Sequence, residues 1–600
     1  MKLTKEELIK LREQVLQIKT PGEIEKILEH KTLYQRLKDV AKRKPDSKAI
    51  LYFGNVITYR QLLTMVDTAA KGFHELGIKY NDVVTMSLLA TPYGIVSLYA
   101  LDKIGATMHM VNCSSSIEEI KRELNNIKSK YFIANDIFCS KELRIELEKL
   151  GVERIITTSL TDAIPMGFNF TNGFAGDKLK FQLIGKLKGV SKKEYNKKLI
   201  NFEQLLTLGR QSKTEVIACD FTPNKNVTIA YTSGSTGNAK ACVATWEAID
   251  SLIQVMGMTE TGRFAETDTM FATFPLWIYY SLLNMIHEPL SLGVALALDP
   301  LFKPENITKR NEQYKFNHWL TIPPYIKVMV NQNKPTDCSR WKIIITGGAE
   351  LQDEVKIKGD KYIKRNNGSA CVEQGYGASE VLGSFAYSYH ENPTIGSLGV
   401  PCIGNMIKIL DLETGKELGP NQTGVGYLYT PARMSEYYAD EEATKHNLVK
   451  DENGVIWYNT EDLLHQNERG EIFLDGRIRR IALTLDSEGN PTKIIPERTK
   501  KSIYQLNEID KCEVITVPDE LIENKAIAFV VINGQLNEEE LRNKILKHCQ
   551  ATVPEYMVPK EIIFIEEMPL NAGNKPDLKA LEQLYKNSTL NKPKKRKRKK

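Results

Sequence analysis

This sequence of 600 residues lacks paired cysteines, long apolar runs and the pattern of a secretory signal peptide. Its nine cysteines are scattered and none belongs to a Cys-x-x-Cys pair, so we expect neither a zinc site nor a disulfide framework. A reducing, cytoplasmic environment fits this cysteine usage best. No apolar run approaches the ~18 residues that a membrane-spanning helix requires. The charged start contains a capping pattern, Thr4 with Glu7, which predicts a helix and not a secretory signal peptide.

An excess of charge of one sign is also missing from most of the chain. The formal net charge is +6, but residues 592–600 carry eight positive charges, and subtracting these leaves −2 for the rest. That balance disfavours nucleic-acid binding by the folded body. For the basic tail, the sequence leaves three alternatives: a solvated, disordered segment, peripheral contact with an anionic membrane through residues 592–600, or a nuclear-import or RNA contact.

The length and the order of the elements predict an α/β protein with more than one domain, because 600 residues exceed the size at which one hydrophobic core keeps growing. Helical and strand patterns alternate over residues 32–158, which predicts parallel-rich sheets with helices on both faces. Residues 160–215 break the alternation and predict a surface insertion, partly helical near residues 202–208. From residue 396 short strands and tight turns predict a β-rich subdomain, and a compact α+β unit follows Arg480.

The expected domain limits follow from these changes of pattern. They are an N-terminal helical extension over 1–30, a large domain over 31–478, a small mobile α+β domain over 479–586 and a disordered basic tail over 587–600.

The strongest local signal is a stretch rich in glycine and hydroxyl groups, Tyr-Thr-Ser-Gly-Ser-Thr-Gly-Asn-Ala-Lys, at residues 231–240. It follows an apolar run over 227–230 that predicts a buried strand. Glycines let successive backbone N–H groups turn inward around an anion, and the hydroxyls and Lys240 add further donors. The stretch therefore predicts a polyphosphate-binding loop, with a plain flexible surface loop as the alternative. It is not a Walker loop, since Lys240 follows Asn-Ala and precedes no serine or threonine.

Further chemical signals follow at the ends of predicted strands. The strand over 342–346 ends in Gly-Gly-Ala-Glu, and glycines at the carboxyl end of a parallel strand often mark where a ligand approaches the backbone. Tyr376 lies between two glycines, which leaves one face free for stacking on a flat ring. Glu380 could hold a hard cation such as Mg²⁺. The aromatic run over 275–280 predicts either core packing or the wall of an apolar pocket.

Five motifs, taken in order, resemble those of the adenylate-forming superfamily of acyl-CoA synthetases, luciferases and peptide-synthetase adenylation domains. They are the loop over 231–240, Gly-Tyr-Gly-x-Ser-Glu over 375–380, Thr-Glu-Asp over 460–462, Gly-Arg at 476–477 and the Pro-to-Lys segment over 569–575. The resemblance covers roughly residues 33–584. One such motif is a weak signal, whereas five in the same order are a strong one.

The resemblance implies a role for each matching residue. Phosphate binding falls to Thr232, Ser233, Gly234, Ser235, Thr236, Gly237 and Lys240. The borders of adenine and of the acid fall to Gly347, Gly348, Ala349, Gln374, Gly375, Tyr376, Gly377 and Ser379, with Tyr376 stacking on adenine. Glu380 would bind Mg²⁺, Asp462 and Arg477 the ribose, and Lys575 the substrate carboxylate and α-phosphate. Catalytic roles fall to Thr236, Lys240, Glu380 and Lys575, and Arg479 stands at the hinge.

The implied activity is activation of a carboxylic acid by ATP to an acyl-adenylate with release of pyrophosphate, then transfer to the thiol of coenzyme A. Mg²⁺ and a lysine would offset the repulsion between a carboxylate and a phosphate. The nucleophile is already ionised and needs no base, which agrees with the lack of a histidine-containing catalytic signature. No aspartate stands near Leu276, where amino-acid-activating members place one, and the apolar residues over 276–282 favour a fatty or aromatic acid.

Two alternatives stay open at this point. A free-standing adenylating enzyme would load the thiol of a carrier protein instead of coenzyme A. A degenerate family member would bind its ligands without turnover. The second alternative is motivated by Glu461, which stands where the family has glycine, by Leu483 in place of a common lysine, and by a longer loop over 484–492.

Overall fold

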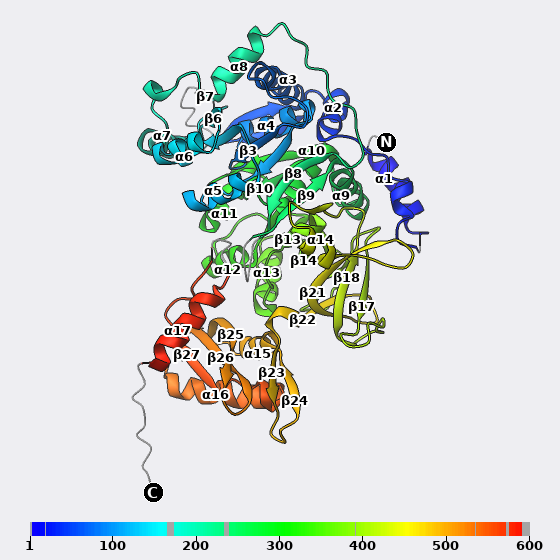
Figure 1. The fold of residues 1–600 in the computed structure, drawn as a ribbon, viewed down its shortest axis with the longest axis vertical. Coiled ribbons are helices and arrows are strands. Elements are labelled where there is room, and N and C mark those ends of the chain that lie inside the picture. The colour runs from blue at the N-terminus through cyan, green and yellow to red at the C-terminus, as the bar shows by residue number, and fades with distance from the viewer. Residues whose placement is uncertain are drawn as a thin grey trace. The chain divides into compact units, whose positions relative to one another are not determined.

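The computed structural model describes residues 3–18, 20–164, 173–232, 239–389, 392–534, 536–571 and 575–590 (Figure 1). Its chain divides into two compact units. The first comprises Met1–Thr232, Lys240–Ile407 and Leu428–Tyr458, and the second comprises Ser233–Ala239, Lys408–Tyr427 and Asn459–Lys600. Strand β21 passes from the first unit into the second, whereas we expected the change of domain at residue 479. The expected domain limits stay a prediction.

The first unit contains a nine-stranded sheet whose central pairs, from β14 through β13, β12, β10 and β11 to β1, are parallel. The strands in spatial order are β16 (Val400–Pro401), β15 (Gly383–Tyr387), β14 (Val372–Ala378), β13 (Ile343–Thr346), β12 (His318–Thr321), β10 (Thr269–Ala272), β11 (Ala295–Leu298), β1 (Lys48–Tyr52) and β2 (Asn55–Thr58). Buried aliphatic and aromatic residues fill its central strands, as expected for a sheet covered on both faces.

An eight-stranded sheet forms the second layer of this unit. Its order is β19 (Glu436–Tyr437), β9 (Ala241–Thr245), β8 (Asn226–Tyr231), β4 (Thr107–Met110), β3 (Val83–Ser87), β5 (Tyr131–Asn135), β6 (Arg154–Thr158) and β7 (Leu199–Asn201). All pairs from β8 to β7 are parallel, whereas β9 runs antiparallel to both β8 and β19. The alternation predicted over residues 32–158 is therefore confirmed.

Helices surround these sheets, and Figure 1 shows α2, α3, α4 and α8 gathered at one end of the eight-stranded sheet. The helices of the first unit are α1 (Lys5–Val15), α2 (Leu33–Arg43), α3 (Tyr59–Glu75), α4 (Pro92–Ile104), α5 (Ile117–Asn126), α6 (Lys141–Lys149), α7 (Ala175–Lys188), α8 (Phe202–Gln211), α9 (Trp246–Thr259), α10 (Glu288–Leu292), α11 (Ile307–Tyr314), α12 (Pro323–Gln332), α13 (Asp353–Arg365) and α14 (Glu441–Asn447). Thr4 forms the predicted capping box with Glu7, and Thr245 caps α9.

The stretch over 160–215 is more integrated than a surface insertion. Helix α8 covers the predicted helical part, but the three residues of β7 pair in parallel with β6 and extend the sheet. Such a short strand leaves no periodic signal in the sequence, because its place depends on pairing with a strand that is already formed.

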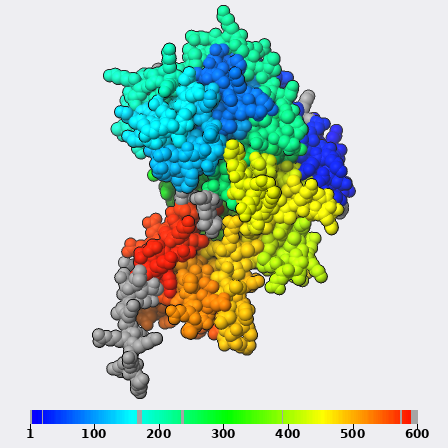
Figure 2. All heavy atoms as spheres, in the orientation of Figure 1, coloured from blue at the N-terminus to red at the C-terminus, as the bar shows by residue number. Residues whose placement is uncertain are grey.

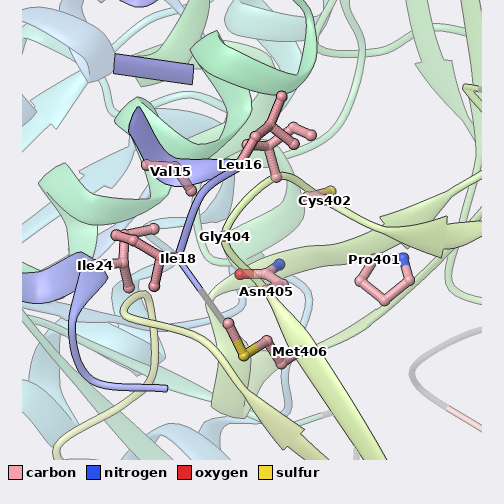
Figure 3. Close-up of a pocket in the computed structure, with 10 residues that line it drawn as sticks. Val15, Leu16, Ile18, Ile24, Pro401, Cys402, Gly404, Asn405 and Met406 are labelled. Atoms are coloured by element: carbon pink, nitrogen blue, oxygen red, sulfur yellow. The ribbon is translucent and has the colours of Figure 1, made fainter. Parts of the chain in front are cut away.

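The N-terminal extension belongs to the first unit and packs on its helices. Leu8, Leu11 and Val15 of α1 are buried, and α1 packs on α9. Between the extension and the turn before β17 lies a pocket of about 200 Å³, drawn in Figure 3. It is lined by Val15, Leu16, Ile18, Ile24 and residues 401–406, none of which is a predicted site residue.

A five-stranded sheet forms the predicted β-rich region. Its order is β17 (Met406–Leu410), β18 (Gly424–Tyr429), β21 (Ile456–Gln466) and β20 (Leu448–Lys450), with β22 (Ile472–Arg477) also paired to β21.

The rest of the second unit is an α+β structure. It contains the hairpin of β23 (Ala482–Leu485) and β24 (Pro491–Ile494), the sheet of β25 (Ile509–Asp519), β26 (Glu523–Ile532) and β27 (Glu561–Phe564), and helices α15 (Pro496–Tyr504), α16 (Glu538–Thr552) and α17 (Leu578–Leu590). Alternate residues of β26 face opposite cores: Ala528 and Val530 join one, Phe529 and Val531 the other.

Helix α17 reaches further than predicted. Residues 587–590, assigned above to the tail, belong to this helix, whose leucines at 578, 581 and 584 keep a helical spacing, and no proline stands between residues 578 and 593 to end it earlier. Residues 591–600 lie outside the described residues. None of the helices in the described part of the chain combines the length and the apolar character needed to cross a membrane.

One buried histidine makes the stability of the first unit depend on pH. His109 of β4 is fully buried, with Thr85 Oγ1 3.0 Å from its Nδ1 and Tyr231 Oη 3.1 Å from its Nε2. Burial lowers the pKa of His109 to about 3. The neutral form is therefore favoured in the folded protein, and below pH 6.5 the unfolded chain binds a proton that the folded chain does not.

We expect stability to fall as the pH decreases from 6.5, with a contribution from His109 of about 2 kcal/mol by pH 5. Thermal unfolding midpoints at pH 7 and pH 5 should therefore differ less in His109→Gln than in the wild type. The matched control is His74→Gln, which replaces an exposed histidine of α3. Equal acid sensitivity of the wild type and His109→Gln would contradict the assignment.

Candidate nucleotide-binding site

The base of the predicted phosphate loop is a closed neck between two antiparallel strands. Strand β8 ends at Tyr231 and β9 begins at Ala241. The Thr232 N–H donates to the Lys240 carbonyl at 2.9 Å, and the Lys240 N–H donates to Thr232 Oγ1 at 3.0 Å. The predicted site residues Ser233, Gly234, Ser235, Thr236 and Gly237 lie outside the described residues. The structure therefore fixes where the loop starts and ends.

Lys240 and Glu380 lie on two sides of one tyrosine. The Lys240 Nζ is 4.6 Å from the centre of the Tyr437 ring and 3.3 Å from Asn447 Oδ1. The Tyr437 hydroxyl donates to Glu380 Oε1 at 2.6 Å. Tyr437 is held there because β19 pairs with β9, where it stands opposite Cys242. We call Lys240, Tyr437 and Glu380 the loop-base cluster.

The sequence analysis missed Tyr437 and Asn447. Tyr437 lies in a two-residue strand and Asn447 at the end of a short helix, and neither belongs to a recognisable motif. Only the pairing of β19 with a strand far away in the sequence brings them to Lys240.

Glu380 fits a Mg²⁺ site in which a bound phosphate and water supply the other oxygen atoms. In the described part of the chain no group of three or more His, Cys, Asp or Glu side chains could hold a metal. Mg²⁺ usually binds one or two carboxylates and takes its other oxygens from phosphate and water. Glu380 is partly exposed and lies in η7 (Ser379–Val381), so its carboxylate can serve as such a ligand.

The glycines after β13 lie beside the residues that precede Glu380. Gln374 links the two segments, because its side chain donates to the carbonyls of Ala349 at 3.3 Å and Gly375 at 2.9 Å. Its Oε1 accepts from the Leu351 N–H at 2.9 Å. Gly347 is buried, whereas Gly348, at a φ of +76°, and Ala349 are exposed. Gln374 is thus a buried link that holds this loop in place.

Close backbone packing explains the glycine after Tyr376. A Cβ atom at Gly377 would lie 1.7 Å from the carbonyl oxygen of Gly383 in β15, so no other residue fits. Tyr376 itself is opposite Ala386 in the same strand pair and is partly exposed. The structure therefore brings three predicted motifs together in the first unit: the neck of the loop, residues 347–349 and residues 374–380.

The predicted ribose residues pair with each other in the second unit. Asp462 of β21 stands opposite Arg477 of β22, and Arg477 Nε is 3.0 Å from Asp462 Oδ1. The Asp462 N–H donates to Thr460 Oγ1, and the Thr460 hydroxyl donates to the Gly426 carbonyl at 2.8 Å. These bonds fix the backbone at Asp462, which is 7% exposed.

Glu461, which stands where the family has glycine, contacts Arg479 of the expected hinge. Arg479 Nη2 is 2.6 Å from Glu461 Oε2. Glu461 has a φ of +56°, a left-handed conformation that glycine adopts without strain. This conformation explains why the family pattern has glycine here.

Lys575 lies between β27 and α17 and is bonded to Asn571. Its N–H donates to Asn571 Oδ1 at 3.1 Å, and its carbonyl accepts from the Asn571 N–H at 2.8 Å. Leu570 and Pro576 form a bridge beside it, and residues 572–574 lie outside the described residues. Lys575, Asp462 and Arg477 belong to the second unit, and Lys240 and Glu380 to the first.

Comparison with known proteins decides the family. The model of the AMP-binding enzyme family matches residues 37–438, and the model of the AMP-binding enzyme C-terminal domain matches residues 501–575. The chain belongs to the AMP-binding enzyme family. The resemblance to the adenylate-forming superfamily is thereby confirmed, as is the expectation of an enzyme of the AMP-forming acid–thiol ligase class.

Curated relatives of this AMP-binding enzyme are CoA ligases for different acids. The chain is 24% identical to 4-coumarate–CoA ligase 4 of Arabidopsis thaliana over 87% of its own length and 85% of the relative. It is 25% identical to a long-chain-fatty-acid–CoA ligase of Bacillus subtilis (strain 168), over 91% and 93%.

Solved structures share the fold. ATP-bound MatB from Rhodopseudomonas palustris matches with a TM-score of 0.75 at 18% identity, over 93% of this chain and 100% of that one. The anthranilate CoA ligase AuaEII in complex with anthranoyl-AMP matches with a TM-score of 0.75 at 17% identity, over 94% and 99%. The predicted fold class is confirmed.

Removing one hydroxyl tests the loop-base cluster. In Tyr437→Phe the ring stays over Lys240, but Glu380 loses a charge-assisted hydrogen bond, which contributes about 1.5–3 kcal/mol. We expect kcat/KM for ATP–pyrophosphate exchange to fall at least tenfold. The matched control is Tyr438→Phe, because the Tyr438 hydroxyl makes no hydrogen bond to any described residue. Unchanged exchange in Tyr437→Phe would show that the bond has no functional role.

The backbone strain at Glu461 is open to a stability comparison. At a positive φ, glycine avoids a steric cost of about 1 kcal/mol that alanine has. We expect Glu461→Gly to unfold at a higher temperature than Glu461→Ala, since both lack the ion pair and only alanine keeps the strain. Glu582, an exposed position of α17, is the control. There we expect Glu582→Ala to unfold at a higher temperature than Glu582→Gly, because alanine favours a helix. The same order at both positions would contradict the left-handed conformation.

Proposed function

We propose that this enzyme activates a fatty or aromatic carboxylic acid with ATP and transfers the acyl group to coenzyme A. The loop-base cluster is the observation that carries the proposal, because it joins the neck of the phosphate loop to the proposed Mg²⁺ ligand within one unit. The family match supports the same reaction class.

Each residue of the site has a proposed task. The loop from Thr232 to Lys240 binds the β- and γ-phosphates, and Tyr376 stacks on adenine beside residues 347–349. Asp462, fixed by Thr460 and paired with Arg477, accepts the ribose hydroxyls. Lys575 bridges the substrate carboxylate and the α-phosphate. Mg²⁺ held by Glu380, when bound, neutralises phosphate charge.

The acid carboxylate attacks the α-phosphorus, and pyrophosphate leaves. Both reacting groups are anionic, so the chain's contribution is to place them in line and to oppose their repulsion with Lys240 and Lys575. The acceptor thiol then displaces AMP from the acyl carbon. We place the hinge for this second step at Arg479, at the start of the small domain over 479–586.

Residues of the predicted aromatic run support an apolar or aromatic acid. Leu276 and Tyr279 are buried in the core, but Tyr280 is only partly buried and begins η5 (Tyr280–His287), a π-helix. π-Helical turns are frequent at functional sites. A Cβ atom built on Gly347 would lie 3.6 Å from the Tyr280 ring, so the ring lies at the carboxyl end of β13. The relatives named for coumarate, fatty acids and anthranilate fit such a wall.

ATP–pyrophosphate exchange with pools of carboxylic acids tests the first step. We expect exchange with a fatty or aromatic pool, and a loss of at least 100-fold in Lys575→Ala. Lys579→Ala, which removes an exposed lysine of α17, is the control and should keep full exchange. A folded protein without exchange in any pool would favour the degenerate binder.

The acceptor is tested with the acid that the first assay identifies. Formation of its CoA thioester supports the proposal, whereas transfer only to a carrier protein that bears the phosphopantetheine thiol would overturn it.

A further inference from the structure

We propose that α7 and the lysines around it dock this protein on the surface of an anionic lipid bilayer. This inference concerns a surface remote from the loop-base cluster in sequence and does not depend on the proposed reaction. Figure 1 shows α7 at the outer edge of the first unit, and the helix contacts η2 (Asp136–Phe138).

The inner face of α7 holds the helix on the first unit. Phe181 is buried and packs edge-on against Phe53, with 4.7 Å between the ring centres. Asp177 forms ion pairs with Arg310 at 2.8 Å and Lys309 at 3.1 Å. The orientation of the helix is therefore determined by packing and by charge, and its opposite face is directed away from the core.

That opposite face is a strip of leucines. Leu179, Leu183 and Leu187 are 59%, 56% and 76% exposed. Their spacing of four residues places them along one side of the helix, and Phe181 falls roughly opposite. Single exposed leucines are ordinary, but three along one side of a helix form an apolar patch of the kind that marks an interaction surface. Figure 2 shows this part of the chain, in teal, on the rim of the first unit.

Exposed lysines lie on α7 and in the segment that follows it. They are Lys180, Lys186, Lys188, Lys192, Lys193, Lys197 and Lys198. None of them takes part in an ion pair with any described residue. The two acidic residues over 175–198, Asp177 and Glu194, are bonded to Arg310 and Arg144. Residues 175–198 thus carry an excess of positive charge, although the chain without its last nine residues has a net charge of −2.

Apolar side chains on one strip with lysines beside them are typical of helices that lie in a membrane interface. On a helical wheel Lys180 and Lys186 flank the leucines on either side. An anionic bilayer satisfies both features, since acyl chains take the leucines and headgroups attract the lysines. A second copy of this chain would bring like charges together, and nucleic acid would leave the leucines in water. A bilayer also dissolves the lipophilic acids proposed as substrates.

Vesicle sedimentation of the full chain tests this surface. The vesicles contain phosphatidylcholine alone or with about one-third phosphatidylserine. We expect binding to the anionic vesicles, weaker binding at high salt, and little binding to the neutral ones. The triple variant Leu179→Gln, Leu183→Gln, Leu187→Gln should bind at least tenfold more weakly. The control triple is Leu412→Gln, Leu521→Gln, Leu584→Gln, which removes three exposed leucines elsewhere and should bind normally.

Two further measurements distinguish α7 from the basic tail and from an interface between copies of the chain. A chain that ends at residue 590 should still bind, and loss of all binding on this truncation would assign the effect to the basic tail and overturn the proposal. Equal binding of both leucine triples would also overturn it, as would a dimer in light scattering that only the α7 triple abolishes. Circular dichroism of each variant verifies that the helix content is retained.

Discussion

The pairing of β9 with two antiparallel neighbours is the constraint on which the candidate site depends. Pairing with β8 closes the neck of the loop through the two bonds between Thr232 and Lys240. Pairing with β19 brings Tyr437 to the same place from far along the chain. Without β19, Lys240 would lose its aromatic neighbour and Glu380 its hydrogen-bond donor. A two-residue strand thus connects motifs that the sequence separates by more than a hundred residues.

The tyrosine between Lys240 and Glu380 also determines how these two side chains are placed. In a direct ion pair the two groups would neutralise each other, but none of the described ion pairs joins Lys240 to Glu380. The ring accepts the ammonium on its face, and the hydroxyl binds the carboxylate, so the two charges are oriented without being neutralised. The proposed polyphosphate and its cation would need opposite charges at separate points, and the proposal assigns these to Lys240 and Glu380.

The sequence predicted the elements that depend on residues close together in the chain. The apolar run before the loop became β8, and Thr4 forms the expected capping box with Glu7 at the start of α1. The sequence could not predict β7, the contact of Tyr437 or the bond network of Gln374, because each depends on a partner far away in the chain. The left-handed turn at Glu461 was hidden for another reason: glutamate does not indicate a positive φ, although the glycine of the family pattern does.

Two adjacent arginines explain which contact would change if the hinge proposed at Arg479 operates. Arg480 pairs with Glu497 at 2.7 Å and Glu513 at 2.6 Å, and all three side chains are at most 15% exposed. Opening this network would leave charges buried without partners, at a cost of several kcal/mol. Arg479 is 47% exposed, and its pair with Glu461 is screened by water and contributes about 1 kcal/mol or less. A rotation at this point would therefore release Arg479 from β21 and keep Arg480 fixed to α15 and β25. Glu461, a departure from the family pattern, and Arg479 thus form the weaker of two neighbouring ion-pair contacts.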